Sequence, residues 1–130
     1  MSVSRETEQL AAYAALLRKW NPAINLVAMS TIDQIETRHI KDSLHLAEAA
    51  ENARGSWVDL GSGGGLPGIV VAIRRPDLEI IMVESDQRKA AFLRNAIREL
   101  GLMRTKVLCE RIETANRLDA ANISARALAP

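Results

Sequence analysis

Apolar residues follow two different spacings along this chain, and the change from one to the other falls near residues 53–56. Before that point they recur at helical spacing, as in the stripe of Leu10, Tyr13, Leu17 and Trp20. The stripe predicts a helix over residues 5–20 that Ser4 caps and that Asn21-Pro22 ends. A second helical segment is predicted from after Ser30 or Thr31 to about residue 50, with a break near His39.

Beyond residue 56 the pattern alternates between short strands and helices. Strands are predicted over residues 56–60, 79–84, 106–109 and 122–127, and helices over 67–74 and 87–100. The run 79–84 is nearly continuously apolar, which is typical of a strand buried on both faces. Strands that alternate with helices predict a parallel sheet with right-handed crossovers, and therefore an α/β fold.

Length and composition fit one globular domain, because the 130 residues are 48% hydrophobic and 25% charged. The net charge of +1 excludes no class of partner. The single cysteine, Cys109, rules out an internal disulfide, which fits the reducing cytoplasm. No stretch approaches the ~20 apolar residues that cross a bilayer, so we expect no membrane partner.

The strongest functional signal is the turn after the first predicted strand, Asp59-Leu60-Gly61-Ser62-Gly63-Gly64-Gly65. Nucleotide-like ligands bind where parallel strands end and helices begin. Glycines at such a place permit a sharp turn, let the backbone approach the ligand, and leave free amides facing a polar group. The turn therefore predicts a site for a nucleotide-like cofactor, with a tight turn that binds nothing as the alternative.

The turn and the second buried strand together indicate an adenosine ligand. A literal dinucleotide fingerprint, Gly63-x-Gly65-x-x-Gly68, begins two residues too late after the strand, and Asp59-x-Gly61-x-Gly63 fits the strand end better. Glu84 ends the second strand, where a carboxylate pointing out of the sheet can accept both ribose hydroxyls. NAD would use the same carboxylate, and a solvated acid at the strand end is the alternative.

Further sequence phrases occur in order: Trp20-Asn21, Ile24-Asn25-Leu26, His39-Ile40-Lys41-Asp42-Ser43-Leu44, Gly65-Leu66-Pro67-Gly68, Arg111-Ile112-Glu113 and Ser124-Ala125-Arg126-Ala127. With the glycine turn, they make the chain resemble the bacterial RsmG family, also called GidB. The resemblance implies a Rossmann-like class I methyltransferase that uses S-adenosyl-L-methionine to methylate guanine N7 in small-subunit (16S) ribosomal RNA. It implies ribosomal RNA or a ribosomal particle as partner, in the cytoplasm, without DNA, membrane or metal.

The resemblance also implies how the chain is divided. Residues 1–53 would form an N-terminal helical extension or lid, and residues 54–130 a Rossmann-like domain that binds S-adenosylmethionine. The family's sheet has seven strands, whereas only four are predicted here. We therefore expect a fragment that ends after about the fourth strand and that methylates RNA poorly or not at all.

Site residues carry over from the family at matching positions. Those assigned to the cofactor are Gly61, Ser62, Gly63, Leu66, Glu84, Ile112, Glu113 and Arg126. Ile112 and Glu113 would line the adenine site, with core packing as the alternative for Ile112. Arg126 would hold the cofactor carboxylate or an RNA phosphate, with an edge salt bridge as the alternative.

No catalytic residue is assigned, and the candidates are Arg126, Arg111 and His39. Guanine N7 has an exposed lone pair and no proton to remove, so alignment with the methyl donor should supply most of the acceleration. We therefore expect His39 to pack or cap near the cofactor and not to act as a general base.

A basic segment is the candidate RNA contact. Between Gln87 and Lys106, six basic residues and one acidic residue, Glu99, give a charge of +5. Such a face can bind phosphates, and a solvated helix face is the alternative. Two other functions stay open: a non-catalytic fragment that binds cofactor or RNA, and an NAD-binding Rossmann domain.

Overall fold

The computed structural model describes residues 4–27, 33–49, 51–113 and 122–124. Its four strands form one parallel sheet in the order β3-β2-β1-β4. The strands are β1 (Ser56–Leu60), β2 (Glu79–Val83), β3 (Thr105–Leu108) and β4 (Asn122–Ser124). The parallel α/β arrangement predicted from the sequence is confirmed.

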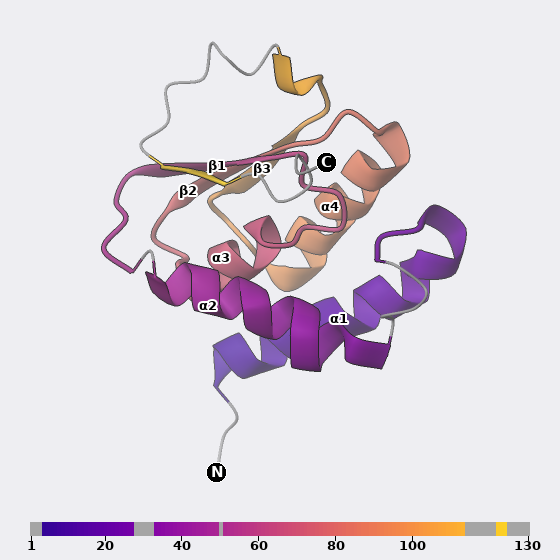
Figure 1. Cartoon of the computed structure of the whole chain (residues 1–130), viewed down its shortest axis with the longest axis horizontal. Helices are drawn as coiled ribbons and strands as arrows, with labels where there is room; N and C mark the ends of the chain where they lie inside the picture. Colours follow the sequence, from indigo (N-terminus) through magenta and orange to yellow (C-terminus); the bar gives the residue numbers. More distant parts are fainter. Residues whose placement is uncertain (1–3, 28–32, 50, 114–121, 125–130) are drawn as a thin grey trace.

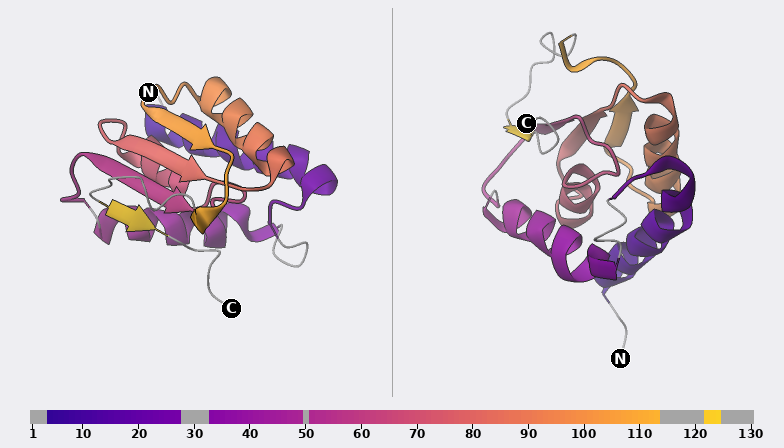
Figure 2. Two further views of the ribbon diagram at one scale, coloured as in Figure 1. Left: turned by 90° about the horizontal axis from the view of Figure 1, so that it is seen from above. Right: turned by 45° about the vertical axis from the view of Figure 1, so that its right-hand side comes forward.

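The short 3₁₀ turn at residues 112–113 lies on one side of this sheet, and the longer described helices all lie on the other (Figure 1). They are α1 (Arg5–Ile24), the π-helix η2 (Ile35–Ile40), α2 (Lys41–Ala49), α3 (Gly68–Arg74) and α4 (Gln87–Leu100). Helices α3 and α4 contact the sheet, while α1 packs on α3 and α4, and α2 packs on α3. The two further views in Figure 2 show the same layering of sheet over helices.

Side chains alternate between the two faces of the sheet, as the period of a strand requires. Trp57, Ile80 and Met82 join the large core that the helices cover. Val58, Ile81 and Val83 form a second buried cluster with Leu60 and Leu108. The apolar run in β2 is thus buried on both faces, as predicted, and Asp59 shares the helix-covered face with Trp57.

Helix α1 begins as predicted but continues past its predicted end. The Ser4 hydroxyl accepts the Thr7 N–H at 3.1 Å, which confirms the cap. The predicted stop at Asn21-Pro22 is wrong, because the helix runs to Ile24 and ends at Asn25 in the left-handed conformation. Burial of Asn21 and Ile24 on the core side outweighs the hydrogen bond that Pro22 removes from the last turn.

Three further boundaries refine the prediction. The second helical segment changes at Ile40 from π-helix to α-helix, next to the break expected near His39. Strand β3 begins and ends one residue earlier than predicted, because Thr105 pairs with Ile80. Residues 125–127 of the predicted fourth strand lie outside the described residues.

None of the described helices is both long and apolar enough to span a membrane.

Candidate cofactor site

The glycine turn lies at the carboxyl end of β1 and is fixed by its own backbone N–H groups. Gly61 and Ser62 donate to the Val83 carbonyl at 2.8 and 3.1 Å, and Gly65 donates to the Ser62 carbonyl at 2.8 Å. Gly63 and Gly68 donate to the carboxylates of Glu84 and Asp59. The sequence predicted free amides for a ligand, but these five N–H groups are used inside the protein. The turn is therefore held rigidly, and its anion-binding capacity is reduced.

Two of the glycines serve different purposes. A Cβ on Gly65, whose φ is +93°, would lie 2.4 Å from the Ile69 side chain, so Gly65 is required for packing. A Cβ on Gly63, whose φ is +55°, would meet nothing closer than the Gly61 carbonyl at 4.0 Å. The space beside Gly63 is therefore open, as a cofactor contact requires.

The N-terminal helix supports the turn directly. The buried Tyr13 hydroxyl donates to the Gly64 carbonyl at 2.6 Å. A Cβ on Gly64 would approach Leu26 and Leu17 to 3.2 and 3.3 Å, so both side chains pack against the turn. The position of the turn therefore depends on α1 and on the segment that follows it.

A cavity of about 330 Å³ opens over the turn. Its lining residues are Leu26, Val27, His39, Gly61, Ser62, Gly63, Gly64, Leu66 and Lys89. Five residues predicted from the sequence therefore come together here: Gly61, Ser62, Gly63, Leu66 and His39. Leu26, Val27 and Lys89 were not predicted as site residues. Leu26 stands in the phrase Ile24-Asn25-Leu26 and Lys89 in the first turn after the Asp86 cap, whereas Val27 carries no sequence signal.

Glu84 follows β2 and joins the turn to the next helix. One carboxylate oxygen accepts the Gly63 N–H at 2.6 Å, and the other accepts the Asp86 N–H at 2.9 Å. The side chain is only 7% exposed, because the backbone of the turn and of Asp86 covers the carboxylate at the carboxyl end of β2. Each oxygen keeps a second lone pair, and a ribose hydroxyl would share these acceptors.

Asp59 is a second buried carboxylate, on the opposite side of the turn. Its oxygens accept the Gly68 N–H at 3.1 Å and the Ser124 hydroxyl at 2.9 Å, so it joins α3 to β4. Burial raises the pKa of Asp59 to about 6, against the lowering effect of the hydrogen bonds that it accepts and with a small contribution from the Glu84 charge. Asp59 thus lies between Gly68 and β4, near the carboxyl end of β1, with a pKa of about 6.

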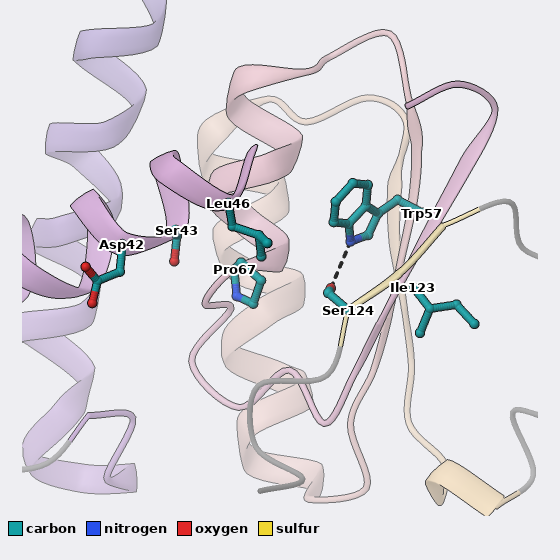
Figure 3. Close-up of a pocket in the computed structure, with 7 residues that line it drawn as sticks. All are labelled: Asp42, Ser43, Leu46, Trp57, Pro67, Ile123 and Ser124. Atoms are coloured by element: carbon teal, nitrogen blue, oxygen red, sulfur yellow. Dashed lines mark hydrogen bonds between the residues drawn. The ribbon is translucent and has the colours of Figure 1, made fainter. Parts of the chain in front are cut away.

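A neighbouring cavity of about 370 Å³ lies between α2 and the β1–β4 edge (Figure 3). It is lined by Asp42, Ser43, Leu46, Trp57, Pro67, Ile123 and Ser124, and the indole N–H of Trp57 donates to the Ser124 hydroxyl at 2.8 Å. Leu66 lines the first cavity, and Pro67, the next residue in the chain, lines the second cavity. The two cavities are therefore adjacent at the carboxyl end of β1.

The remaining predicted residues lie elsewhere or outside the described part of the chain. Ile112 and Glu113 form a short 3₁₀ turn after β3, with Ile112 half-buried and both Arg111 and Glu113 exposed. None of the three lines the cavity over the glycine turn. Arg126 lies outside the described residues. The assignment of these residues to the site therefore stays a prediction.

The basic segment forms an exposed surface. Arg88, Arg94, Arg98, Arg104 and Lys106 are exposed, and Lys89 is half-buried. Within the part of the chain that the structure describes, none of these six residues takes part in the ion pairs, which join Arg18 to Glu36, Arg74 to Glu6 and Arg75 to Asp77. Across the described part of the chain, no group of three or more His, Cys, Asp or Glu side chains could hold a metal ion.

Comparison with known proteins identifies the family. The family model GidB, described as rRNA small subunit methyltransferase G, matches residues 6–130. The chain belongs to the GidB family. It is 82% identical over its whole length to ribosomal RNA small subunit methyltransferase G of Paracoccus denitrificans, covering 67% of that protein. It is 52% identical to the methyltransferase of the same description from Ruegeria sp. TM1040, where the match covers 99% of this chain and 64% of that protein.

The chain therefore spans about two thirds of the length of these curated GidB relatives. Among solved structures, a complex of MtNAS with MTA and tNA is similar, with a TM-score of 0.60 and 19% sequence identity. That match covers 97% of this chain and 46% of MtNAS. At this identity the likeness concerns the fold alone, and it agrees with the Rossmann-like architecture expected from the sequence.

Proposed function

We propose that this chain carries the cofactor site of an S-adenosylmethionine-dependent methyltransferase that acts on small-subunit ribosomal RNA. The observation that carries the proposal is the cavity over the glycine turn, in a chain whose sequence belongs to the GidB family along residues 6–130. Its substrate, in our proposal, is a guanine N7 in 16S ribosomal RNA, in the cytoplasm where ribosomes are made.

The residues over the turn fit this cofactor. Gly63 leaves open space beside the backbone, Leu26, Val27 and Leu66 give apolar walls, and Glu84 offers carboxylate oxygens next to Gly63. When bound, S-adenosylmethionine supplies an electrophilic methyl group on a sulfonium. Guanine N7 carries a lone pair and no proton, so this chain's residues need only bind and align the two partners. His39, at the cavity wall, then serves for packing and not as a base.

Calorimetry with the purified chain tests the cofactor. We expect S-adenosylhomocysteine to bind and NADH to bind more weakly or not at all. Gly63→Ala should weaken S-adenosylhomocysteine binding, because the added methyl enters the open space beside the turn. Gly55→Ala is the matched control, since Gly55 also has a positive φ, +81°, but precedes β1 at the other end of the sheet. Tighter binding of NADH than of S-adenosylhomocysteine would replace this proposal with the NAD-binding one.

A second experiment tests the reaction and its position. The chain is incubated with small-subunit particles or their RNA and tritiated S-adenosylmethionine, with the Paracoccus denitrificans relative as positive control. Borohydride reduction followed by aniline cleavage then locates any N7-methylguanine. Since the chain spans about two thirds of that relative, we expect weaker transfer than from the relative, at the same nucleotide. Transfer by the relative to another base atom would refute the N7 assignment.

The non-catalytic reading makes a different prediction for the same assays. A fragment that only binds would take up S-adenosylhomocysteine and RNA but transfer no tritium. The exposed basic residues of α4 and its sequel would then carry the RNA contact. The tritium-transfer assay therefore distinguishes the catalytic from the non-catalytic hypothesis, whereas the binding assays do not.

A further inference from the structure

Among the residues that the structure describes, Lys89 is the one lysine or arginine that lines the cavity over the glycine turn. It lies in the first turn of α4, where the Asp86 carboxylate caps its backbone N–H at 3.1 Å. Its neighbour Arg88 is exposed and does not line the cavity, whereas Lys89 is half-buried. Lys89 thus differs from the other basic residues of the segment by facing the candidate cofactor.

The turn itself has little left with which to bind an anion. The N–H groups of Gly61, Ser62 and Gly65 donate to backbone carbonyls, and those of Gly63 and Gly68 donate to Glu84 and Asp59. A glycine turn at a helix start usually meets negative charge with such groups. Since five of them are used here, a cationic side chain is the stronger partner left for a negative group in this cavity.

Lys89 meets that requirement. Among the described residues that line the cavity none carries a carboxylate, although the Glu84 carboxylate lies next to it on the Gly63 N–H, and Lys89 takes part in no ion pair of the described residues. Leu26, Val27 and Leu66 give the cavity an apolar wall, and a charge pair is stronger beside apolar groups than in open water. A lysine ammonium offers three donors to an anionic oxygen.

We propose that Lys89 binds the carboxylate of the amino-acid tail of S-adenosylmethionine, which leaves the RNA phosphate as the role of Arg126. This inference rests on the proposed function, since it assumes that cofactor in this cavity. In this placement the ribose would meet the Glu84 carboxylate, and the tail would lie in the cavity that Lys89 lines. The positive charge of Lys89 then selects a ligand with a carboxylate over one that carries adenosine alone.

The decisive experiment compares two ligands by calorimetry. S-adenosylhomocysteine carries the carboxylate, whereas 5′-methylthioadenosine keeps the adenosine and the thioether but lacks the amino-acid tail. We expect Lys89→Gln to weaken S-adenosylhomocysteine binding roughly tenfold, equivalent to ~1.4 kcal/mol. Binding of 5′-methylthioadenosine should stay within about twofold of the unmodified chain, and Lys89→Arg should restore most of the affinity for S-adenosylhomocysteine.

Arg88→Gln is the matched control, since it removes an equal charge from the same helical turn outside the cavity. It should leave both affinities unchanged. Equal losses for the two ligands in Lys89→Gln would mean a structural role, and no loss for either would also overturn the inference. RNA binding without cofactor is the remaining arm: a loss there in Lys89→Gln, with intact S-adenosylhomocysteine binding, would assign Lys89 to a phosphate instead.

The outcomes separate this inference from the proposed function. If the unmodified chain binds no S-adenosylhomocysteine, the proposed cofactor is wrong. If it binds S-adenosylhomocysteine and the Lys89→Gln chain binds it equally well, the cofactor stands and only the role of Lys89 falls.

Discussion

Replacing Glu84 by glutamine tests how the glycine turn is held. The carboxylate accepts the N–H groups of Gly63 and Asp86 at 2.6 and 2.9 Å, one on each oxygen. Glutamine keeps one oxygen, but its amide NH₂ then faces the other backbone N–H, and two donors cannot pair. The change keeps the size of the side chain, so it removes charge and one acceptor without leaving a hole.

The magnitude follows from these two contacts. A hydrogen bond to an ionised group contributes ~1.5–3 kcal/mol, and a buried N–H without an acceptor adds to the loss. Because Glu84 is only 7% exposed, water compensates little, and we expect the free energy of unfolding to fall by about 2 kcal/mol. For a chain of this length, that lowers Tm by roughly 6–10 °C. Loss of a charged acceptor for the ribose should also weaken S-adenosylhomocysteine binding about tenfold.

Thermal melting and calorimetry on the same samples check both effects, below the Tm of the variant. The matched control is Glu79→Gln at the other end of β2, where the side chain is exposed and a surface change usually stays within ~0.5 kcal/mol. An unchanged Tm in Glu84→Gln would refute the inference that the Glu84 hydrogen bonds stabilise the turn. An unchanged affinity with a lowered Tm would mean that the ribose is held elsewhere.

Three further predictions concern the same edge of the sheet. The pKa of Asp59 is raised from 3.8 to about 6, so the neutral carboxyl stabilises the fold below about pH 3.8. This stabilisation, at most ~3 kcal/mol, is lost as pH rises through 6. In denaturant titrations, Asp59→Asn should therefore make the free energy of unfolding vary less with pH between 3.8 and 6. Tyr13→Phe leaves the Gly64 carbonyl without its 2.6 Å donor and should cost ~1–2 kcal/mol in the same titrations, whereas no change would mean that α1 does not support the turn. Gly65→Ala should destabilise the chain by at least ~2 kcal/mol, since its Cβ would lie 2.4 Å from Ile69 in a left-handed conformation, and a melting curve like that of the unmodified chain would contradict this.

The elements near the site could be predicted because their signals are local. Asp86 and Gly101 mark the ends of α4, and the apolar run in β2 is unambiguous once both of its faces are known to be covered. The end of α1 could not be predicted in the same way. Pro22 is a local stop signal, and what overrides it is burial of Ile24 against residues far away in the sequence.

The direction of side chains at the site was less predictable than its place. A glutamate at the end of β2 could be expected beside the turn, but sequence does not reveal that both its oxygens turn back to Gly63 and Asp86. Lys89 was counted only as one charge in a basic segment, because helical phase alone does not say which residue of a first turn faces a cavity. Such assignments need the packing of η2 and α1 around the turn, which no local pattern encodes.

The internal hydrogen bonds of the glycine turn bear on how a cofactor would be recognised. A turn held from β2, α1 and Asp59 is fixed before a ligand arrives, so little conformational entropy of the turn is lost on binding. The same bonds consume the donors that would otherwise contact the ligand. Recognition must then come from side chains placed around the turn, and His39, Glu84 and Lys89 come from three different elements or their ends.

The core that fixes these elements is shared between residues before and after the change of pattern near residues 53–56, since Tyr13, Ile35 and Phe92 are buried in one cluster. Rigidity of the turn and selectivity of the cavity therefore depend on the same packing, and a change that loosens α1 should reduce both together.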